Sequence, residues 1–143
     1  MKIRSGFVSN SSSSSFVVIM KNGKELSKET LLETFDVKKT SPLYSFAKDL
    51  SEWITNNLEE FDIKGIYENF CNNDATTTEE MITELVEDRN MNQSDLNKIA
   101  SKEYRYYEGS ASDDSGDSLE YYLCEHEMKI ETDDIRINGG GSY

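Results

Sequence analysis

The chain has 143 residues, of which 28 are acidic and 15 are basic, and its formal net charge at pH 7 is −13. A chain of this length forms one domain with a hydrophobic core, and an apolar share of 36% is enough to build that core. An acidic surface of this kind repels nucleic-acid phosphates and anionic lipid headgroups but attracts basic proteins. We therefore expect a basic protein partner, no direct nucleic-acid binding and no membrane binding.

The first 40 residues differ from the rest in charge, because they hold seven basic and four acidic residues. Their apolar run at 16–20 is short and follows a run of serines. A secretory signal needs an apolar stretch of roughly 7–15 residues, so we expect the protein in the cytoplasm. Cys71 and Cys124 agree with this expectation, because two cysteines are too few for a disulfide framework or a zinc knuckle.

The N-terminal part of the chain predicts a loop, a strand and two helices. Residues 5–15 are rich in serine, which competes for local hydrogen bonds, and they predict a flexible loop. The apolar, β-branched run at 16–20 predicts a buried strand. Ser27 is placed to cap a short helix over 28–35. A Ser-Pro start and apolar residues at three- and four-residue spacing predict a longer helix over 42–60. The core side chains expected from this helix are Phe46, Leu50, Trp53 and Ile54.

The middle of the chain predicts three shorter helices. A weak apolar pattern up to residue 70 indicates a short helix that follows Gly65. Thr77 and Glu80 have the spacing of a capping box, which predicts the start of a second helix. Ser94 is placed to cap one or two further helical turns.

The C-terminal third returns to strands. Residues 104–108 are aromatic and predict a strand. The segment 119–127 fits a helix or a strand, and we favour a helix because a serine precedes it. Alternating apolar residues at 128–132 and 135–138, on either side of Asp-Asp, predict a hairpin. The glycine-rich end, 139–143, predicts a tail.

This order of elements predicts the fold class α+β. The expected strands lie near the two ends of the sequence, and the expected helices lie between them. A doubly wound sheet would instead alternate strands with helices. We expect a single domain over 1–143, in which a small mixed or antiparallel sheet packs against several helices.

The N-terminus begins Met-Lys-Ile-Arg and continues, after Ser5, with Gly-Phe-Val-Ser-Asn-Ser-Ser-Ser-Ser-Ser-Phe. This string resembles the opening of many uncharacterised phage and bacterial proteins. The resemblance implies a phage or bacterial origin. Because the bodies of those proteins differ widely, it also implies a separate role for the N-terminus. It implies no activity, and no functional residue is carried over from it.

The serine run within this string is a candidate site in its own right. Its backbone N–H groups can form an anion-binding nest, its hydroxyls can be phosphorylated, or the run can act as a recognition tag. A P-loop is excluded because the sequence lacks G-x-x-x-x-G-K-[ST]. An ordinary polar connector is the default interpretation. The candidate residues are Ser9, Asn10, Ser11, Ser12, Ser13, Ser14 and Ser15.

Two other clusters suggest a metal site, but neither completes a motif. Residues 113–117 fail the register of a calcium loop, because Gly116 in the sixth position would put Tyr122 where a glutamate is needed. Cys124 and His126 would point about 200° apart on a helix, and too few further ligands exist for zinc. We therefore expect no metal, no cofactor and no catalytic residue. A looser cation site remains an alternative to a solvated turn, with four carboxylates: Asp113, Asp114, Asp117 and Glu120.

Acidic helix faces are the strongest functional candidate. On the helix that starts near Thr77, the residues Glu80, Glu84 and Glu87 share one face, and Asp88 lies beside Glu84. Like charges at this spacing destabilise a helix, so a purely structural design would intersperse lysines. Rows of carboxylates can also imitate a phosphate backbone. The alternative interpretation is a solvated face.

These observations lead to the hypothesis of a non-enzymatic, acidic protein-binding module. It would be phage-associated and would act as an inhibitor or nucleic-acid mimic directed at a basic host protein. The alternative hypothesis is a small enzyme or modification substrate that acts through the serine-rich N-terminus. The acidic rows favour the first hypothesis and the serine run favours the second.

Overall fold

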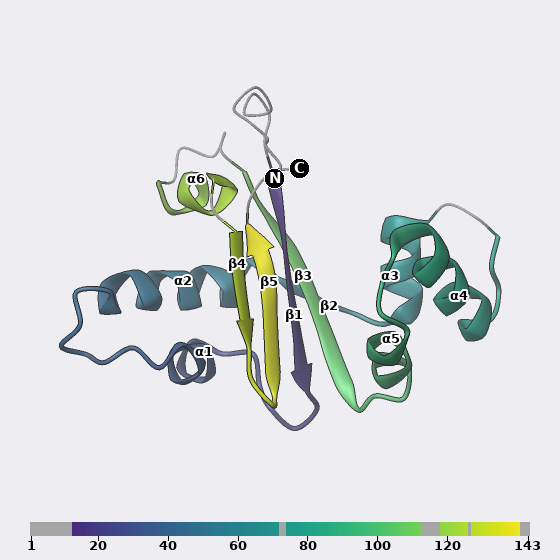
Figure 1. The fold of residues 1–143 in the computed structure, drawn as a ribbon, viewed down its shortest axis with the longest axis horizontal. Helices are drawn as coiled ribbons and strands as arrows, with labels where there is room; N and C mark the ends of the chain where they lie inside the picture. The colour runs from purple at the N-terminus through teal and green to yellow at the C-terminus, as the bar shows by residue number, and fades with distance from the viewer. Residues whose placement is uncertain (1–12, 72–73, 113–117, 126, 141–143) are drawn as a thin grey trace.

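The computed structural model describes residues 13–71, 74–112, 118–125 and 127–140. In this part of the chain five strands form one antiparallel sheet in the order β2-β3-β1-β5-β4, with helices on both sides (Figure 1). The fold class is therefore α+β, as predicted. The strands are β1 (Ser13–Lys21), β2 (Glu59–Phe61), β3 (Tyr104–Ser112), β4 (Glu127–Glu131) and β5 (Ile135–Gly140). The helices are α1 (Lys28–Phe35), α2 (Tyr44–Asn57), α3 (Ile63–Phe70), α4 (Thr78–Arg89), α5 (Gln93–Ala100) and α6 (Ser118–Glu125).

The central strand, β1, is buried on both of its faces. Phe16, Val18 and Met20 belong to the core on one side of the sheet, and Ile19 belongs to the core on the other. This division follows from strand geometry, in which successive side chains point to opposite faces. A strand that is covered on both sides reads as a continuous apolar run, and that is the pattern of residues 16–20.

Helices α1, α2 and α6 cover the first face of the sheet. Leu50, Trp53 and Ile54 of α2 are buried there, as predicted, and Phe46 is half-buried at the margin. The rings of Trp53 and Phe16 meet edge to face, with centroids 5.3 Å apart and planes inclined by 67°. Aromatic pairs favour this geometry. The contact joins α2 to the middle of the sheet.

Helices α3, α4 and α5, hereafter the helical unit, cover part of the second face (Figure 1). Ile66, Leu85 and Leu96, one from each helix, are buried together with Ile19 and Tyr106 of the sheet. Most of the packing against the sheet comes from α5 against β3 and from α3 against β2. The helical unit therefore rests on the β2-β3 side of the sheet.

Helix α2 is shorter than the predicted helix at both ends. It begins at Tyr44, with Leu43 as an N-cap that forms no side-chain hydrogen bond, rather than at the predicted Ser-Pro start, and the residues after its C-terminal end form an additional strand. Residues 59 and 60 were expected to be helical, but they belong to β2, which pairs with Tyr106–Glu108 of β3. Gly109 of β3 permits this close approach, because a Cβ atom there would lie 2.3 Å from the carbonyl oxygen of Asn57. Backbone pairing with β3 thus overrides the apolar periodicity, which continues through Phe61.

The four predicted strands are present, and three of them, β1, β3 and β5, are longer than expected. β1 begins at Ser13, so the prediction of a loop is wrong for the last three serines of the run. β5 includes Gly139 and Gly140, so the predicted tail is too long at its start. Gly139 lies opposite Phe16, and a Cβ atom there would lie 2.4 Å from Phe16 Cδ2. The buried ring therefore requires a glycine at this position.

Several helix caps follow the sequence. Ser27 caps α1, Thr77 forms a capping box with its N3 glutamate at the start of α4, and α6 confirms the helix predicted near 119–127. The N-cap of α5 is Asn92 rather than Ser94, because the Asn92 side chain accepts a hydrogen bond from the N–H of the N3 residue. Asp62 caps α3 in the same way, so this helix begins before the predicted point.

We expect Trp53→Ala to lower the free energy of unfolding by about 3–5 kcal/mol, because it removes a large buried ring. The indole N–H of Trp53 is buried and has no acceptor among the described residues. Trp53→Phe should therefore cost much less, since it keeps a ring against Phe16 and removes the unpaired donor. Urea unfolding measures both changes, with Leu43→Ala at an exposed position as the control. A loss below about 1 kcal/mol for Trp53→Ala would show that the ring is not part of the core.

Candidate functional site

Glu80, the first of the predicted acidic row, closes the capping box at the start of α4. Its Oε1 atom accepts hydrogen bonds from the backbone N–H groups of Thr76, at 3.3 Å, and Thr77, at 3.1 Å. The hydroxyl of Thr77 accepts in return from the N–H of Glu80, at 3.2 Å. These backbone donors hold the pKa of Glu80 below its ordinary value. Glu80 therefore stabilises the helix as well as adding surface charge.

Glu84 also has a partner inside the molecule. The hydroxyl of Tyr67 donates to its carboxylate and lies 3.2 Å from each oxygen. The same hydroxyl accepts from the N–H of Ala75 at 3.2 Å. Burial raises the pKa of Tyr67, so its hydroxyl remains a donor. Glu84 thus ties α4 to α3.

Glu87 and Asp88 differ from the first two acidic residues. Both are exposed in the last turn of α4, and neither carboxylate forms a hydrogen bond or ion pair within the described ranges. The carbonyl end of a helix is its negative end, so carboxylates in this turn are unfavourable. Arg89 beside them donates from Nε to the carbonyl oxygen of Phe70, at 2.7 Å. The predicted row is therefore divided into two residues with structural contacts and two without.

The serine run contributes three residues to the described structure. Ser13, Ser14 and Ser15 form the start of β1; the side chain of Ser14 is buried and that of Ser15 is exposed. The remaining candidates lie outside the described residues: Ser9, Asn10, Ser11 and Ser12. The interpretation as a plain connector therefore does not hold for the end of the run.

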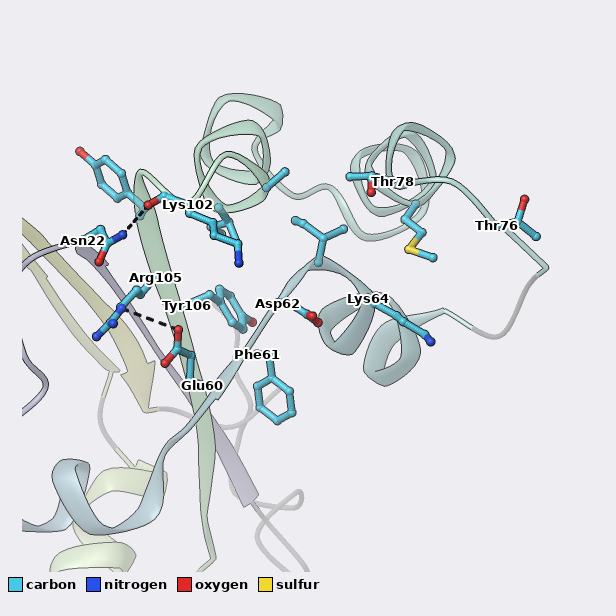
Figure 2. A pocket seen from close by; sticks show the side chains of 15 residues that line it. Asn22, Glu60, Phe61, Asp62, Lys64, Thr76, Thr78, Lys102, Arg105 and Tyr106 are labelled. Carbon is cyan, nitrogen blue, oxygen red and sulfur yellow. Dashed lines mark hydrogen bonds and ion pairs between the residues drawn. The ribbon is translucent and has the colours of Figure 1, made fainter.

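A crevice that no sequence motif predicted lies between the helical unit and strands β2 and β3 (Figure 2). Its volume is about 550 Å³. Four separate segments of the chain contribute to it, so no local pattern in the sequence could identify it. The nearest signal is the aromatic character of the start of β3. The large apolar side chains of the lining are those of Phe61, Ile63, Met81, Ile99, Tyr104 and Tyr106.

The charged groups of the crevice are mostly engaged. Glu60 pairs with Arg105, with 3.8 Å between Oε2 and Nε, and Asp62 Oδ1 accepts from the N–H of Gly65 at 2.8 Å. Figure 2 shows Lys102 directed into the space between β3 and α3. In the described part of the chain its ammonium group forms no ion pair. The lining also includes Lys64, and ammonium groups beside aromatic walls suit a small anion with an apolar body.

The backbone of Lys102 is in a conformation that glycine normally adopts. Its φ is +66°, and it follows the end of α5. The N–H of Lys102 bonds to the carbonyl of Ile99, and the next N–H bonds to that of Lys98. This pair of bonds defines a Schellman motif, in which glycine is the usual residue. The side chain of Asn22 donates to the carbonyl oxygen of Lys102 at 2.8 Å and helps to hold it.

Tyr106 forms the buried wall of the crevice and is the most strongly perturbed tyrosine in the described structure. Its hydroxyl donates to Glu108 Oε1 at 2.7 Å. Burial first, and then the neighbouring carboxylate, raise the pKa of Tyr106 far above its ordinary value. The phenol is therefore protonated at every physiological pH and cannot act there as a base.

The other predicted clusters contribute little to a site. Cys71 is half-buried, and Cys124 is buried with its thiol donating to the carbonyl of Ala111 at 3.5 Å. Glu120 accepts from the N–H of Ser112 at 3.0 Å. His126 and the acidic residues at 113–117 lie outside the described residues. Among the residues that are described, no three His, Cys, Asp or Glu side chains gather as metal ligands.

Comparison with known proteins adds no assignment, because no family, no curated protein and no solved structure matches the chain. Within the described ranges, no helix is both long enough and apolar enough to cross a membrane.

The cap formed by Glu80 gives a pH-dependent prediction. Since folding lowers the pKa of Glu80, its contribution to stability is present above its ordinary value of 4.5 and is lost as the pH falls through the folded value. Glu80→Ala should therefore be less stable than wild type at pH 7, and the difference should shrink below about pH 4.5. Urea unfolding between pH 7 and pH 3 measures it. Glu79→Ala removes the same charge from the same turn without the cap, and equal effects for both variants would contradict the prediction.

The left-handed residue at the end of α5 gives a second prediction. Lys102→Gly should raise the free energy of unfolding by roughly 0.5–1 kcal/mol, because glycine adopts this conformation without the Cβ clash. Lys102→Ala keeps the strained backbone and should show no such gain. Thermal and urea unfolding of the two variants measure the difference. A destabilised Lys102→Gly would show that the side chain supports the fold.

Proposed function

We propose that this protein is a non-catalytic binding module whose acidic helical unit engages a basic protein partner. The observation that carries the proposal is the position of Glu87 and Asp88. They are exposed, they lie at the end of α4 where negative charge is unfavourable, and their carboxylates form no hydrogen bond or ion pair with the described residues. Residues that cost stability and have no structural role are those that a binding surface retains.

The charge of the helical unit supports a basic partner. Residues 62–103 contain ten acidic and four basic residues. Two of those bases, Arg89 and Lys98, contact groups of this chain: the carbonyl of Phe70 and the ring of Tyr104. Complementary charge would steer a basic protein toward this side of the molecule and speed its association.

The N-terminal string indicates which kind of basic protein the partner is. The N-terminal string resembles those of phage and bacterial proteins, so we propose a basic host protein as the target. A host protein that handles nucleic acid has a basic cleft, and carboxylates can occupy such a cleft in place of phosphates. The module would then act as an inhibitor by competing with nucleic acid.

The test uses a variant that removes only the two carboxylates without internal contacts, Glu87→Gln/Asp88→Asn. We expect it to be slightly more stable than wild type, because it relieves the charge at the helix end. Partners captured from host lysate on the wild-type protein should be depleted on the variant. With a purified partner, association should slow several-fold while dissociation changes little, since exposed charges act mainly on encounter. Surface plasmon resonance at increasing salt measures both rates.

The matched control is Glu29→Gln/Glu33→Gln on α1, which removes two exposed carboxylates from the opposite side of the sheet. It should associate as the wild type does. Binding should also weaken as salt rises, because exposed charges are screened over about 8 Å at physiological ionic strength. If both variants bind equally well and the complex is insensitive to salt, the acidic helical unit is a solvated surface and the proposal is wrong.

A further inference from the structure

Among the residues that the structure describes, none pairs with the outer edge of the sheet at β4. β4 is the last strand in the sheet order, and in the described part of the chain it pairs only with β5. The hairpin between them closes with the N–H of Thr132 bonded to the carbonyl of Ile135 at 2.8 Å. Bonded and unbonded residues alternate along an antiparallel pair, so the N–H and C=O groups of Glu127, Lys129 and Glu131 are directed to the open side. An added strand could therefore form backbone hydrogen bonds with three residues of β4.

An apolar groove runs beside this edge on the first face of the sheet. Figure 1 shows the N-terminal half of α2 extending past β4, and side chains from both elements line a groove of about 290 Å³. Leu43 is 63% exposed and Tyr122 is 44% exposed, although both are large and apolar. The rings of Tyr122 and Phe46 meet edge to face, with centroids 5.1 Å apart. α2 therefore forms an apolar overhang above the place where an added strand would lie.

The two faces of β4 present different chemistry to such a strand. Met128 and Ile130 point toward the groove. Glu127, Lys129 and Glu131 are exposed and alternate with them, so strand geometry places them on the opposite face, although Glu127 also borders the end of the groove. Residues directly opposite each other in an antiparallel pair share a face. A complementary strand therefore has apolar residues toward the overhang and, on its other face, the charge order basic-acidic-basic.

We propose that β4 and the overhang of α2 bind an extended segment of a partner protein as an additional strand, with alternating apolar and charged residues in that order. Strand addition of this kind takes its affinity from the backbone and its specificity from alternate side chains. A second copy of this chain fits poorly when centred on Lys129, because Glu127 would face Glu131 and Lys129 would face its counterpart. The surface lies across the sheet from α4, so this proposal stands independently of the acidic helical unit.

The first test uses two synthetic peptides with blocked ends. Thr-Lys-Val-Glu-Val-Lys-Thr has the charge order that complements β4, and Thr-Glu-Val-Lys-Val-Glu-Thr has the reverse. Three cross-strand charge pairs are attractive with the first peptide and repulsive with the second. We therefore expect the first peptide to bind about tenfold more tightly or better. Isothermal titration calorimetry gives the affinities. Amide shifts of Glu127, Lys129 and Glu131 in ¹⁵N NMR spectra should report the contact.

The second test isolates the backbone N–H of residue 129 by comparing two variants that both lack the lysine charge. Lys129→Pro removes an N–H that points to the open side, which an edge strand tolerates, and Lys129→Thr removes the same charge but keeps the N–H. We expect Lys129→Pro to weaken peptide binding about tenfold relative to Lys129→Thr. Glu87→Gln/Asp88→Asn should bind the peptide as the wild type does, so that the two proposals fail or succeed separately.

Three outcomes would overturn the proposal. The two peptides could bind equally well, or not at all, to the folded wild-type protein. Lys129→Pro could bind like Lys129→Thr although circular dichroism shows both to be folded. Light scattering could also show a wild-type dimer that Lys129→Pro dissociates, in which case the edge is an interface between two copies of this chain.

Discussion

The structure depends on the burial of β1 on both faces. One strand supplies Phe16, Val18 and Met20 to the core under α1, α2 and α6, and Ile19 to the core under the helical unit. The neighbouring elements leave space for its side chains. Gly139 makes room for the Phe16 ring, and the ring of Trp53 meets that of Phe16 edge to face. A polar residue in the middle of this strand would lie unsatisfied in one core or the other, and such burial costs several kcal/mol. The two helical layers are therefore linked through a single apolar strand.

The acidic residues of α4 are regularly spaced in the sequence, but they have different roles in the structure. On one face of this helix, Glu80 caps the first turn and Glu84 links α4 to α3. The other two carboxylates form no hydrogen bond or ion pair with the described residues. Only Glu87 and Asp88 lower the stability of the helix without forming a hydrogen bond or ion pair that compensates for it. In the sequence alone, the four acidic residues are equivalent. The hydrogen bonds decide which of them are available to a partner.

The sequence predicts most of the elements because their signals are local. The apolar run of β1, the capping box at Thr77 and the stripe around Trp53 each depend on residues close together in the chain. β2 was missed because it exists through pairing with β3, which begins more than forty residues later. The crevice and the groove beside β4 were missed for a similar reason, since each is assembled from distant segments. Of the candidate site, sequence could name the acidic residues but not their internal partners.

The register of β1 has a consequence for the synthesis of the chain. Phe16 is paired with Gly109 and Gly139, so both neighbours of the central strand are made roughly ninety or more residues after it. Contacts of such long range form slowly, because a large loop must close before any pairing stabilises it. The helical unit, by contrast, is continuous in sequence and can form while the sheet is still incomplete. During that interval the apolar run at 16–20 has no partner strand, and the abundant negative charge of the rest of the chain limits its association with other copies.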